Sequence, residues 1–211
     1  GFLDATTGWR SEFLVVGLVG AAVAFCYFRY VGETHRPDGK ISIQLSAILR
    51  GYWGLLTDLR FIAPAGAMGL YMGALFAMFS VSPRVLIDGL GFSPIQVGTF
   101  FATTVLAVFA SGMAAPRVAL RLGHARATII GLSIATLGGL VLLAAHWTAP
   151  SIWTYFIPVM IFLTGFGMVA PLVTATALQP FGDRAGLASA LLGFLQMAGA
   201  SIGVVLTASI A

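Results

Sequence analysis

Charged residues are scarce in this chain. Asp, Glu, Lys and Arg together make up 9% of its 211 residues, whereas hydrophobic residues make up 59% and the mean hydropathy is +0.98. Soluble globular domains carry about 25% charged residues, so an ordinary soluble domain is excluded. The composition instead predicts a polytopic membrane protein, whose main surroundings are the lipid bilayer.

Cysteine is nearly absent as well. Cys26 is the single cysteine and falls in an apolar stretch, so neither a disulfide framework nor a cysteine-based metal site is expected. The three histidines, His35, His124 and His146, fall in predicted loops, where a ligand role is not favoured. We therefore expect no metal and no cofactor.

The apolar stretches lack titratable residues at mid-depth, which are the usual markers of proton relays and ion sites. An intramembrane protease would need a buried nucleophile with its partners, and an alcohol phosphotransferase would need clustered aspartates. The acidic residues are instead scattered through the polar segments, as Asp4, Glu12, Glu33, Asp38, Asp58, Asp88 and Asp183. We expect no enzyme chemistry, and any proton-coupling carboxylate should lie near a membrane face or outside this sequence.

Long apolar runs fill most of the chain. A helix needs about 20 apolar residues to cross a bilayer, and the runs are continuous rather than alternating as in a β-barrel. They predict an all-α membrane protein with six spans, at 13–31, 61–82, 94–115, 127–145, 152–175 and 186–209. We expect Pro83 and Arg84 to lie in the turn after the second of these spans.

Between the first two spans, residues 41–59 carry apolar side chains at three- and four-residue steps. This pattern predicts an amphipathic helix at the membrane surface. An interfacial connector between two helix bundles is favoured over a regulatory or partner-binding linker.

The basic residues give the orientation. Residues 112–126 hold Arg117, Arg121 and Arg126 between two uncharged runs, and we expect this segment to be a loop. Lys and Arg are enriched in cytoplasmic loops. With six spans, all basic residues except Arg10 and Arg84 fall on the same, cytoplasmic side. This sidedness explains the net charge of +4, and a nucleic-acid partner is not expected because the basic residues adjoin apolar runs.

Mildly polar and aromatic side chains fall at the depth where transporters bind substrate. Aromatic and Met side chains offer a deformable apolar surface, and a few uncharged polar groups orient a ligand. The candidate cavity residues are Tyr71, Met72, Phe76, Phe79, Thr103, Thr164 and Gln196. The alternative for each of them is ordinary packing between helices.

Small residues recur in the spans, including Gly69 with Gly73 and Gly199 with Gly203 at the spacing that lets helices approach closely. Close packing accounts for them. A sharper hypothesis is that Gly165, Gly167 and Pro171 make the fifth span bendable during a gating motion.

Several motifs resemble the major facilitator superfamily. Gly8-Trp9-Arg10 precedes the first span, Glu33-Thr34 follows it, and residues 80–83 and 91–94 border the next outer turn. The segments 175–178, 180–181, 184–186 and above all 188–196 resemble its Bcr/CflA drug-resistance branch.

This resemblance implies part of a twelve-helix fold, covering spans six to eleven. Residues 1–31 would be the end of a periplasmic loop and the last span of an N-terminal bundle, residues 32–60 a cytoplasmic amphipathic linker, and residues 61–211 a C-terminal bundle lacking its last span. The first and fourth spans here would face lipid and the other four the central cavity. A chain that opens at Gly1 without Met is also expected to be a fragment.

The segment 112–126 resembles the family's basic loop motif G-x-x-x-D-R-x-G-R-R, with Pro116 in place of the Asp. By resemblance, this cytoplasmic segment would serve gating or topology through Gly112, Arg117, Arg121, Gly123 and Arg126.

The resemblance further implies a proton-driven antiporter of the bacterial inner membrane that expels small amphipathic compounds. It would act by alternating access together with the missing N-terminal bundle. A facilitator for another solute, such as a sugar or an organic acid, and a non-transporting six-helix scaffold remain alternatives.

Overall fold

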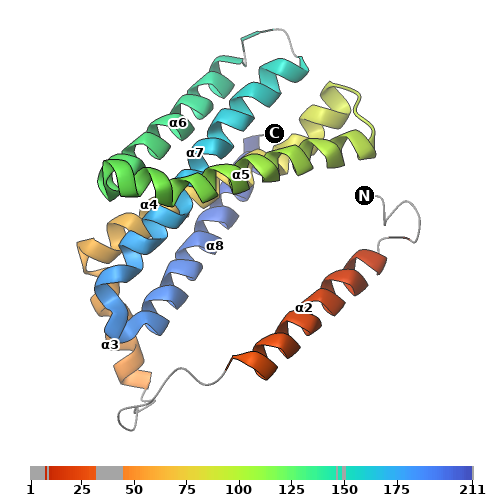
Figure 1. Cartoon of the computed structure of the whole chain (residues 1–211). Coiled ribbons are helices and arrows are strands. Elements are labelled where there is room, and N and C mark those ends of the chain that lie inside the picture. The colour runs from red at the N-terminus through yellow and green to blue at the C-terminus, as the bar shows by residue number, and fades with distance from the viewer. Residues whose placement is uncertain (1–7, 9, 32–44, 146, 149–150, 211) are drawn as a thin grey trace. The chain divides into compact units, whose positions relative to one another are not determined.

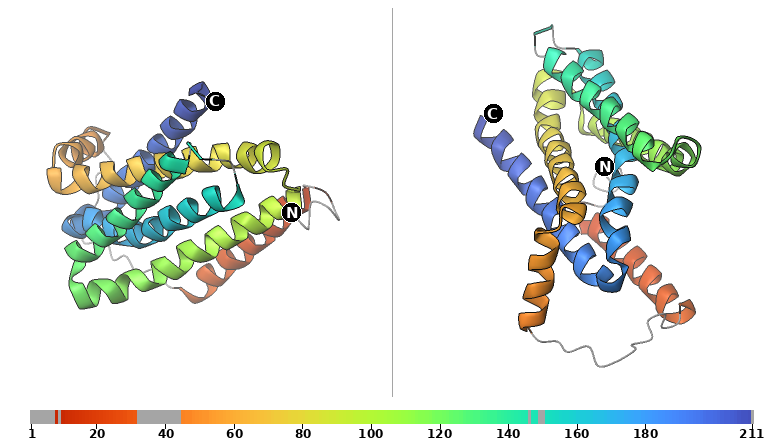
Figure 2. Two further views of the ribbon diagram at one scale, coloured as in Figure 1. Left: turned by 90° about the horizontal axis from the view of Figure 1, so that it is seen from above. Right: turned by 90° about the vertical axis from the view of Figure 1, so that its left-hand side faces the viewer.

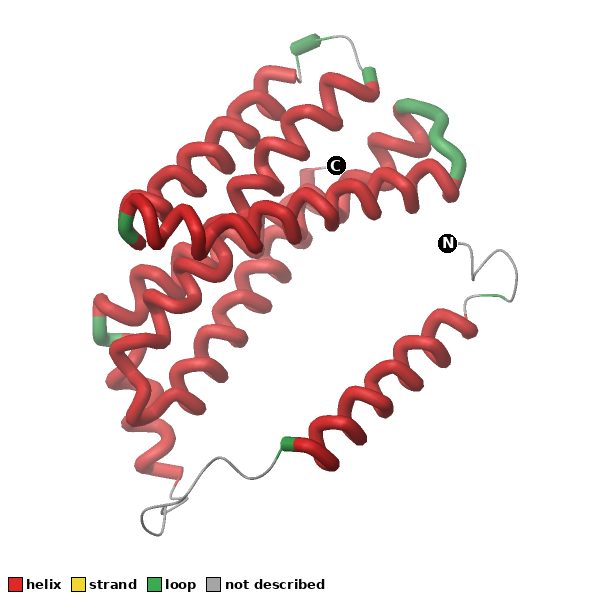
Figure 3. Tube along the Cα trace, viewed as in Figure 1, coloured by secondary structure: helices red, strands yellow, loops and turns green. Residues whose placement is uncertain are grey.

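The computed structural model describes residues 8, 10–31, 45–145, 147–148 and 151–210. Nearly all of this described part is helical, and it contains no strand (Figure 3). The helices are α2 (Arg10–Tyr30), α3 (Leu45–Leu56), α4 (Leu59–Pro83), α5 (Pro94–Leu122), α6 (His124–Ala145), α7 (Ile152–Leu178) and α8 (Ala185–Ile210). The all-α membrane fold predicted from the sequence is confirmed.

The chain divides into two units, residues 1–44 and residues 45–211. The first unit contains α2, a helix of 21 residues of which none is buried. Its apolar side chains suit contact with lipid. The second unit contains α3 to α8, and the description below concerns this unit.

The described residues include 5 continuous helical segments that are long and apolar enough to cross a membrane. The last of them, Ile152–Ser209, has 58 residues and includes both α7 and α8. A 3-10 turn, Gln179–Arg184, separates these two helices, because the backbone of Phe181 leaves the helical region with φ −121° and ψ 34°. The chain reverses direction at this turn (Figure 1), so the segment consists of two helices, of 27 and 26 residues, that are each long enough to cross a membrane.

Local capping sets where the helices begin. The Ser93 hydroxyl accepts a hydrogen bond from the Gln96 N–H, and the Gln96 side chain accepts one from the Ser93 N–H, which together form a capping box at the start of α5. Ser151 and Thr154 form the equivalent pair before α7. The Asp58 carboxylate caps α4 by accepting the N–H of Arg60 at 2.9 Å.

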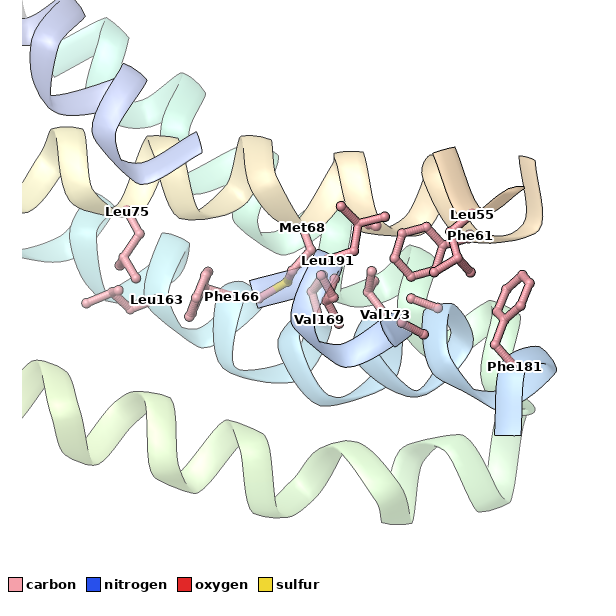
Figure 4. Close-up of a cluster of buried hydrophobic side chains, with 14 of the residues drawn as sticks. Leu55, Phe61, Met68, Leu75, Leu163, Phe166, Val169, Val173, Phe181 and Leu191 are labelled. Atoms are coloured by element: carbon pink, nitrogen blue, oxygen red, sulfur yellow. The ribbon is translucent and has the colours of Figure 1, made fainter. Parts of the chain in front are cut away.

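The core lies between α4, α7 and α8, and its inward-pointing side chains are drawn in Figure 4. Met68 from α4, Val169 from α7 and Leu191 from α8 belong to one buried cluster. Leu55 of α3 and Phe181 of the 3-10 turn close the cluster at one end, where both are almost fully buried. The helix α3 is therefore docked on the bundle through Leu55.

Glycines permit the closest helix contacts. A Cβ atom at Gly69 would lie 2.9 Å from the Leu195 carbonyl oxygen, and one at Gly73 would lie 2.8 Å from the Gly199 carbonyl oxygen. These distances leave no room for a side chain where α8 crosses α4, a crossing visible on the right of Figure 2. On the other side of the bundle, Gly131 of α6 faces Val169 of α7 in the same way, at 2.8 Å. The small residues thus serve close packing.

The prediction of a loop at 112–126 was wrong. Helix α5 continues through Pro116, Arg117 and Arg121 to Leu122, and α6 begins at His124. Only Gly123 lies outside the helices, with φ +86°, a conformation that a side chain disfavours. With 29 residues, α5 is about 44 Å long at about 1.5 Å per residue. It therefore exceeds the bilayer core, so its basic end remains helical beyond the membrane.

The turn predicted at Pro83 and Arg84 was also wrong. Helix α4 passes directly into a π-helical turn, Arg84–Gly89, and the chain leaves the helix only at Leu90. Pro83 has no N–H to donate to the helix, and the wider π turn begins directly after it. Part of the predicted linker, residues 32–44, lies outside the described residues. The remainder of the linker contains α3, whose range of Leu45–Leu56 lies within the amphipathic helix predicted at residues 41–59.

Candidate substrate-binding site

Tyr71 serves helix packing. Its ring stacks on Phe162 and Phe166 of α7, with ring centroids 6.4 and 6.3 Å apart. Its hydroxyl donates to the Leu132 carbonyl oxygen of α6 at 3.5 Å, the limit of a hydrogen bond. Tyr71 thus joins α4 to both α6 and α7.

The three other candidates on α4 differ in exposure. Met72 and Phe79 are half-buried and pack against the core cluster, where the Phe79 ring meets Phe101 of α5 edge to face at 5.5 Å. Phe76 is 39% exposed. Of the candidates on this helix, Phe76 therefore offers the most free surface to a ligand.

The polar candidates on α5, α7 and α8 are half-buried. The Thr103 hydroxyl donates to the Phe100 carbonyl oxygen at 2.7 Å, and the Thr164 hydroxyl donates to the Met160 carbonyl oxygen at 2.7 Å. Each hydroxyl oxygen can still accept a hydrogen bond from a ligand. Gln196 makes no hydrogen bond within the described part of the chain, so its amide is available.

Of the seven candidates, only Thr103 lines one of the four principal cavities of the described residues. A cavity of about 660 Å³ lies against α4, α6, α7 and α8, and none of the seven candidates lines it. Its lining is mainly small and apolar, with hydroxyls at one end from Thr148, Ser151, Thr154, Tyr155 and Thr207. Sequence reasoning missed this cavity, because Ala and Leu carry no signal that separates a cavity wall from a packed face.

A smaller cavity of about 330 Å³ contains Thr103. It lies where α5 and α7 begin, and its other lining residues are Phe92, Gln96, Thr99, Phe100, Ile152, Trp153 and Phe156. We call it the aromatic pocket. The spacing of Gln96, Thr99 and Thr103 puts them on one face of α5, a signal present in the sequence that the prediction did not use.

The predicted gating segment carries its charge on helix ends. Arg117 donates to the Met113 carbonyl oxygen of its own helix at 3.1 Å. Arg117, Arg121 and Arg126 are exposed, and none forms an ion pair with a described acidic residue. Gly112 lies at the crossing of α5 and α7, where a Cβ atom would be 3.4 Å from the Gly167 carbonyl oxygen.

His124 has a partner that the sequence did not reveal. It is the first residue of α6, and its Nε2 atom lies 2.9 Å from the Leu172 carbonyl oxygen and 3.0 Å from the Thr176 hydroxyl, both on α7. The Nε2 atom must carry the proton to donate to the carbonyl. This bond fastens the start of α6 to α7 next to Pro171, the proposed bend. Of the other histidines, His35 and His146 lie outside the described residues.

The helices, the uncharged spans and the basic ends agree with one family of membrane transporters. The family model described as Major Facilitator Superfamily matches residues 1–204. The chain belongs to the major facilitator superfamily. The members of this family are transporters of small solutes. The chain is therefore part of a multi-pass membrane protein.

Several curated relatives are named as bacterial resistance proteins. A bicyclomycin resistance protein homolog of Haemophilus influenzae is 26% identical over 94% of this chain and 50% of its own length. Multidrug resistance protein D of Escherichia coli is 30% identical over 96% of this chain and 50% of its own length. A chloramphenicol resistance protein of Pseudomonas aeruginosa is 26% identical over 93% of this chain and 43% of its own length. The resemblance to the Bcr/CflA branch is confirmed, and the chain spans about half the length of these relatives.

Proposed function

We propose that this chain is part of a proton-coupled exporter of small amphipathic compounds that works by alternating access in a bacterial inner membrane. The observation that carries the proposal is the uncharged interior of a major facilitator chain, several of whose relatives are named for drug resistance. Between its basic ends, each of the helices α4 to α8 presents only apolar, hydroxyl and amide side chains. Such a surface suits apolar cargo, whereas a sugar carrier generally needs several convergent polar groups.

The substrate contacts in this proposal are made by the candidates that retain free surface or free hydrogen-bonding capacity. Phe76 supplies an aromatic face, Gln196 an amide without a partner among the described residues, and Thr103 and Thr164 acceptor oxygens. Tyr71, Met72 and Phe79 support these contacts from the packed side of α4. Because alternating access needs two bundles around the site, the N-terminal bundle is the required partner.

The proton-coupling carboxylate lies outside the described spans in this proposal, since α4 to α8 have no acid at mid-depth. Arg117 and Arg121 hold the cytoplasmic end, through the topology of α5 and α6 or as a conformational latch. Pro116 stands where the family motif has its Asp, and this difference weighs towards the topological role.

Efflux from cells tests the proposal. The full-length gene is expressed in a bacterial strain that lacks its own exporters, and the cells are loaded with ethidium or chloramphenicol. We expect lower accumulation than in vector-only cells, and a protonophore should abolish the difference. Uptake of a sugar or an organic acid would favour the facilitator alternative, and the absence of any flux in a well-expressed protein would favour the scaffold.

A further inference from the structure

We infer that the aromatic pocket at the start of α5 and α7 is a binding site for an uncharged planar aromatic molecule that carries hydrogen-bonding groups. The pocket lies at the ends of the two helices, whereas the predicted substrate residues lie at mid-depth. Thr103 is the single residue that belongs to both sets. The inference concerns ligand binding and does not depend on transport.

The floor of the pocket is rigid. The Phe100 ring is 5% exposed, stacks on Tyr155 with ring centroids 5.9 Å apart, and meets Phe156 edge to face at 5.7 Å. Trp153 adds a further ring to this set of contacts, because its ring meets Phe156 edge to face with ring centroids 6.3 Å apart. Trp153 is 64% exposed, so most of its indole surface is free. Aromatic side chains fixed in this way form a preorganised stacking surface.

The rim of the pocket is also held in place. The Phe92 N–H donates to the Leu86 carbonyl oxygen at 2.9 Å, which fastens the turn before α5. Gly91 permits this turn with φ +69°. The capping box then fixes the Gln96 side chain, because its Oε1 atom accepts the Ser93 N–H at 2.8 Å. The amide nitrogen of Gln96 is left as a donor at the mouth of the pocket.

The threonines present acceptors. The Thr99 hydroxyl donates to the Ile95 carbonyl oxygen at 3.0 Å, and the Thr103 hydroxyl donates to the Phe100 carbonyl oxygen at 2.7 Å. Since both protons are used within the helix, the two oxygens are free to accept hydrogen bonds from a ligand. A ligand that fits therefore offers donors to Thr99 and Thr103 and an acceptor to Gln96.

The size and the charge of the pocket restrict the ligand further. A volume of about 330 Å³ lies at the lower end of small-molecule sites, so one or two aromatic rings are the upper limit. None of the lining residues is charged, so a charged group would lose hydration without gaining a partner ion.

Quenching of tryptophan fluorescence tests the inference. The probe is chloramphenicol, an uncharged nitrobenzene with an amide and two hydroxyls, whose ring quenches indole on contact. The full-length protein is titrated in lipid nanodiscs without any ion gradient, and Trp153→Phe is titrated beside it. We expect a saturable quench that Trp153→Phe removes and that Trp147→Phe, outside the pocket, retains.

Two further variants test the polar contacts. Thr99→Val keeps the shape of the side chain and removes its acceptor, and we expect about 3- to 10-fold weaker binding, the value of one hydrogen bond. Thr128→Val is the control, because the Thr128 hydroxyl also bonds within its helix but lies outside the pocket. If Thr99→Val fails to give a monodisperse protein, Thr103→Val replaces it.

An equal quench in wild type and Trp153→Phe would overturn the inference, as would unchanged affinity in both threonine variants. Saturable quenching of Trp153 by a protein that shows no efflux would uphold the pocket and refute the exporter. Efflux without quenching of Trp153 would uphold the exporter and refute the pocket.

Discussion

The hydroxyl groups of Ser82 and Tyr155 lie 2.6 Å apart and join α4 to α7. Ser82 is fully buried, and its hydroxyl also lies 2.7 Å from the Met78 carbonyl oxygen. The Ser82 proton therefore goes to that carbonyl, and Tyr155 donates to the Ser82 oxygen. Since Tyr155 also stacks on Phe100 of α5, this pair fixes the N-terminal part of α7 against both α4 and α5.

Ser82→Ala should lower the free energy of unfolding by about 1–3 kcal/mol, because it leaves the Tyr155 hydroxyl without its partner. The change is measured by thermal unfolding of the purified protein, with size-exclusion chromatography to determine how much folded protein remains at each temperature. Ser201→Ala is the matched control, since Ser201 is exposed and bonds only within its own helix. Equal losses in both variants would contradict a role for the pair.

Gly199→Val should destabilise the crossing of α8 and α4 by about 1–3 kcal/mol, the usual cost of overpacking. A Cβ atom at Gly199 would overlap the Gly69 carbonyl. Gly193→Val on the same helix is the control, because a Cβ atom there meets nothing within 4 Å. The midpoint of thermal unfolding should fall for the first variant and stay near the wild-type value for the second.

Replacements of Tyr71 should separate packing from ligand contact. Tyr71→Phe keeps the ring stacked on Phe162 and Phe166, and the hydrogen bond that it loses is long. The midpoint of thermal unfolding should therefore stay near the wild-type value, and the ligand affinity should change by no more than about twofold. Tyr71→Ala should destabilise the protein by on the order of 3 kcal/mol. Unfolding and ligand titration of both variants measure this, and a large loss of affinity in a stable Tyr71→Phe would assign the hydroxyl to substrate.

The cap of α4 should depend on pH. Hydrogen bonds from the Arg60 side chain, 3.1 and 2.8 Å long, hold the pKa of Asp58 below its ordinary value of 3.8. A lowered pKa means that the carboxylate stabilises the fold above this ordinary value and that the contribution is lost as the pH falls towards the lowered pKa. Amide hydrogen exchange of α3 and of the first turn of α4 should therefore accelerate below about pH 4 relative to the other helices.

Asp58→Asn is the control for that experiment. Asn can still cap the helix but does not titrate, so the variant should lack the additional acceleration. The same acceleration in Asp58→Asn would show that another group is responsible.

The sequence was sufficient for the fold class, because long uncharged runs leave few alternatives in a bilayer. It failed where helices extend past the membrane. Arg117 and Arg121 look like loop residues, yet they lie on α5, since a charged side chain on a helix end reaches water without ending the helix.

The contacts of the candidate residues could not be predicted from the sequence. Depth in the membrane can be estimated from position along a span, but the direction of a side chain depends on which helices are neighbours. The stacking of Tyr71 on Phe162 of α7, for example, follows from the arrangement of the helices and not from the position of Tyr71 along its span. His124, expected in a solvated loop, bonds to α7 across 48 positions of sequence, a contact that no local pattern encodes.

Gly123 restricts how the length of this chain can vary. Because it is the only non-helical residue between α5 and α6, a deletion there would force a helical residue into the turn, and a shift of α6 by one residue to supply it would turn the buried face of that helix by about 100°. The buried face of α6, formed by Ala127, Gly131, Ala135 and Gly138, would then no longer meet α7. Differences in length between homologous chains should therefore be rare at this position.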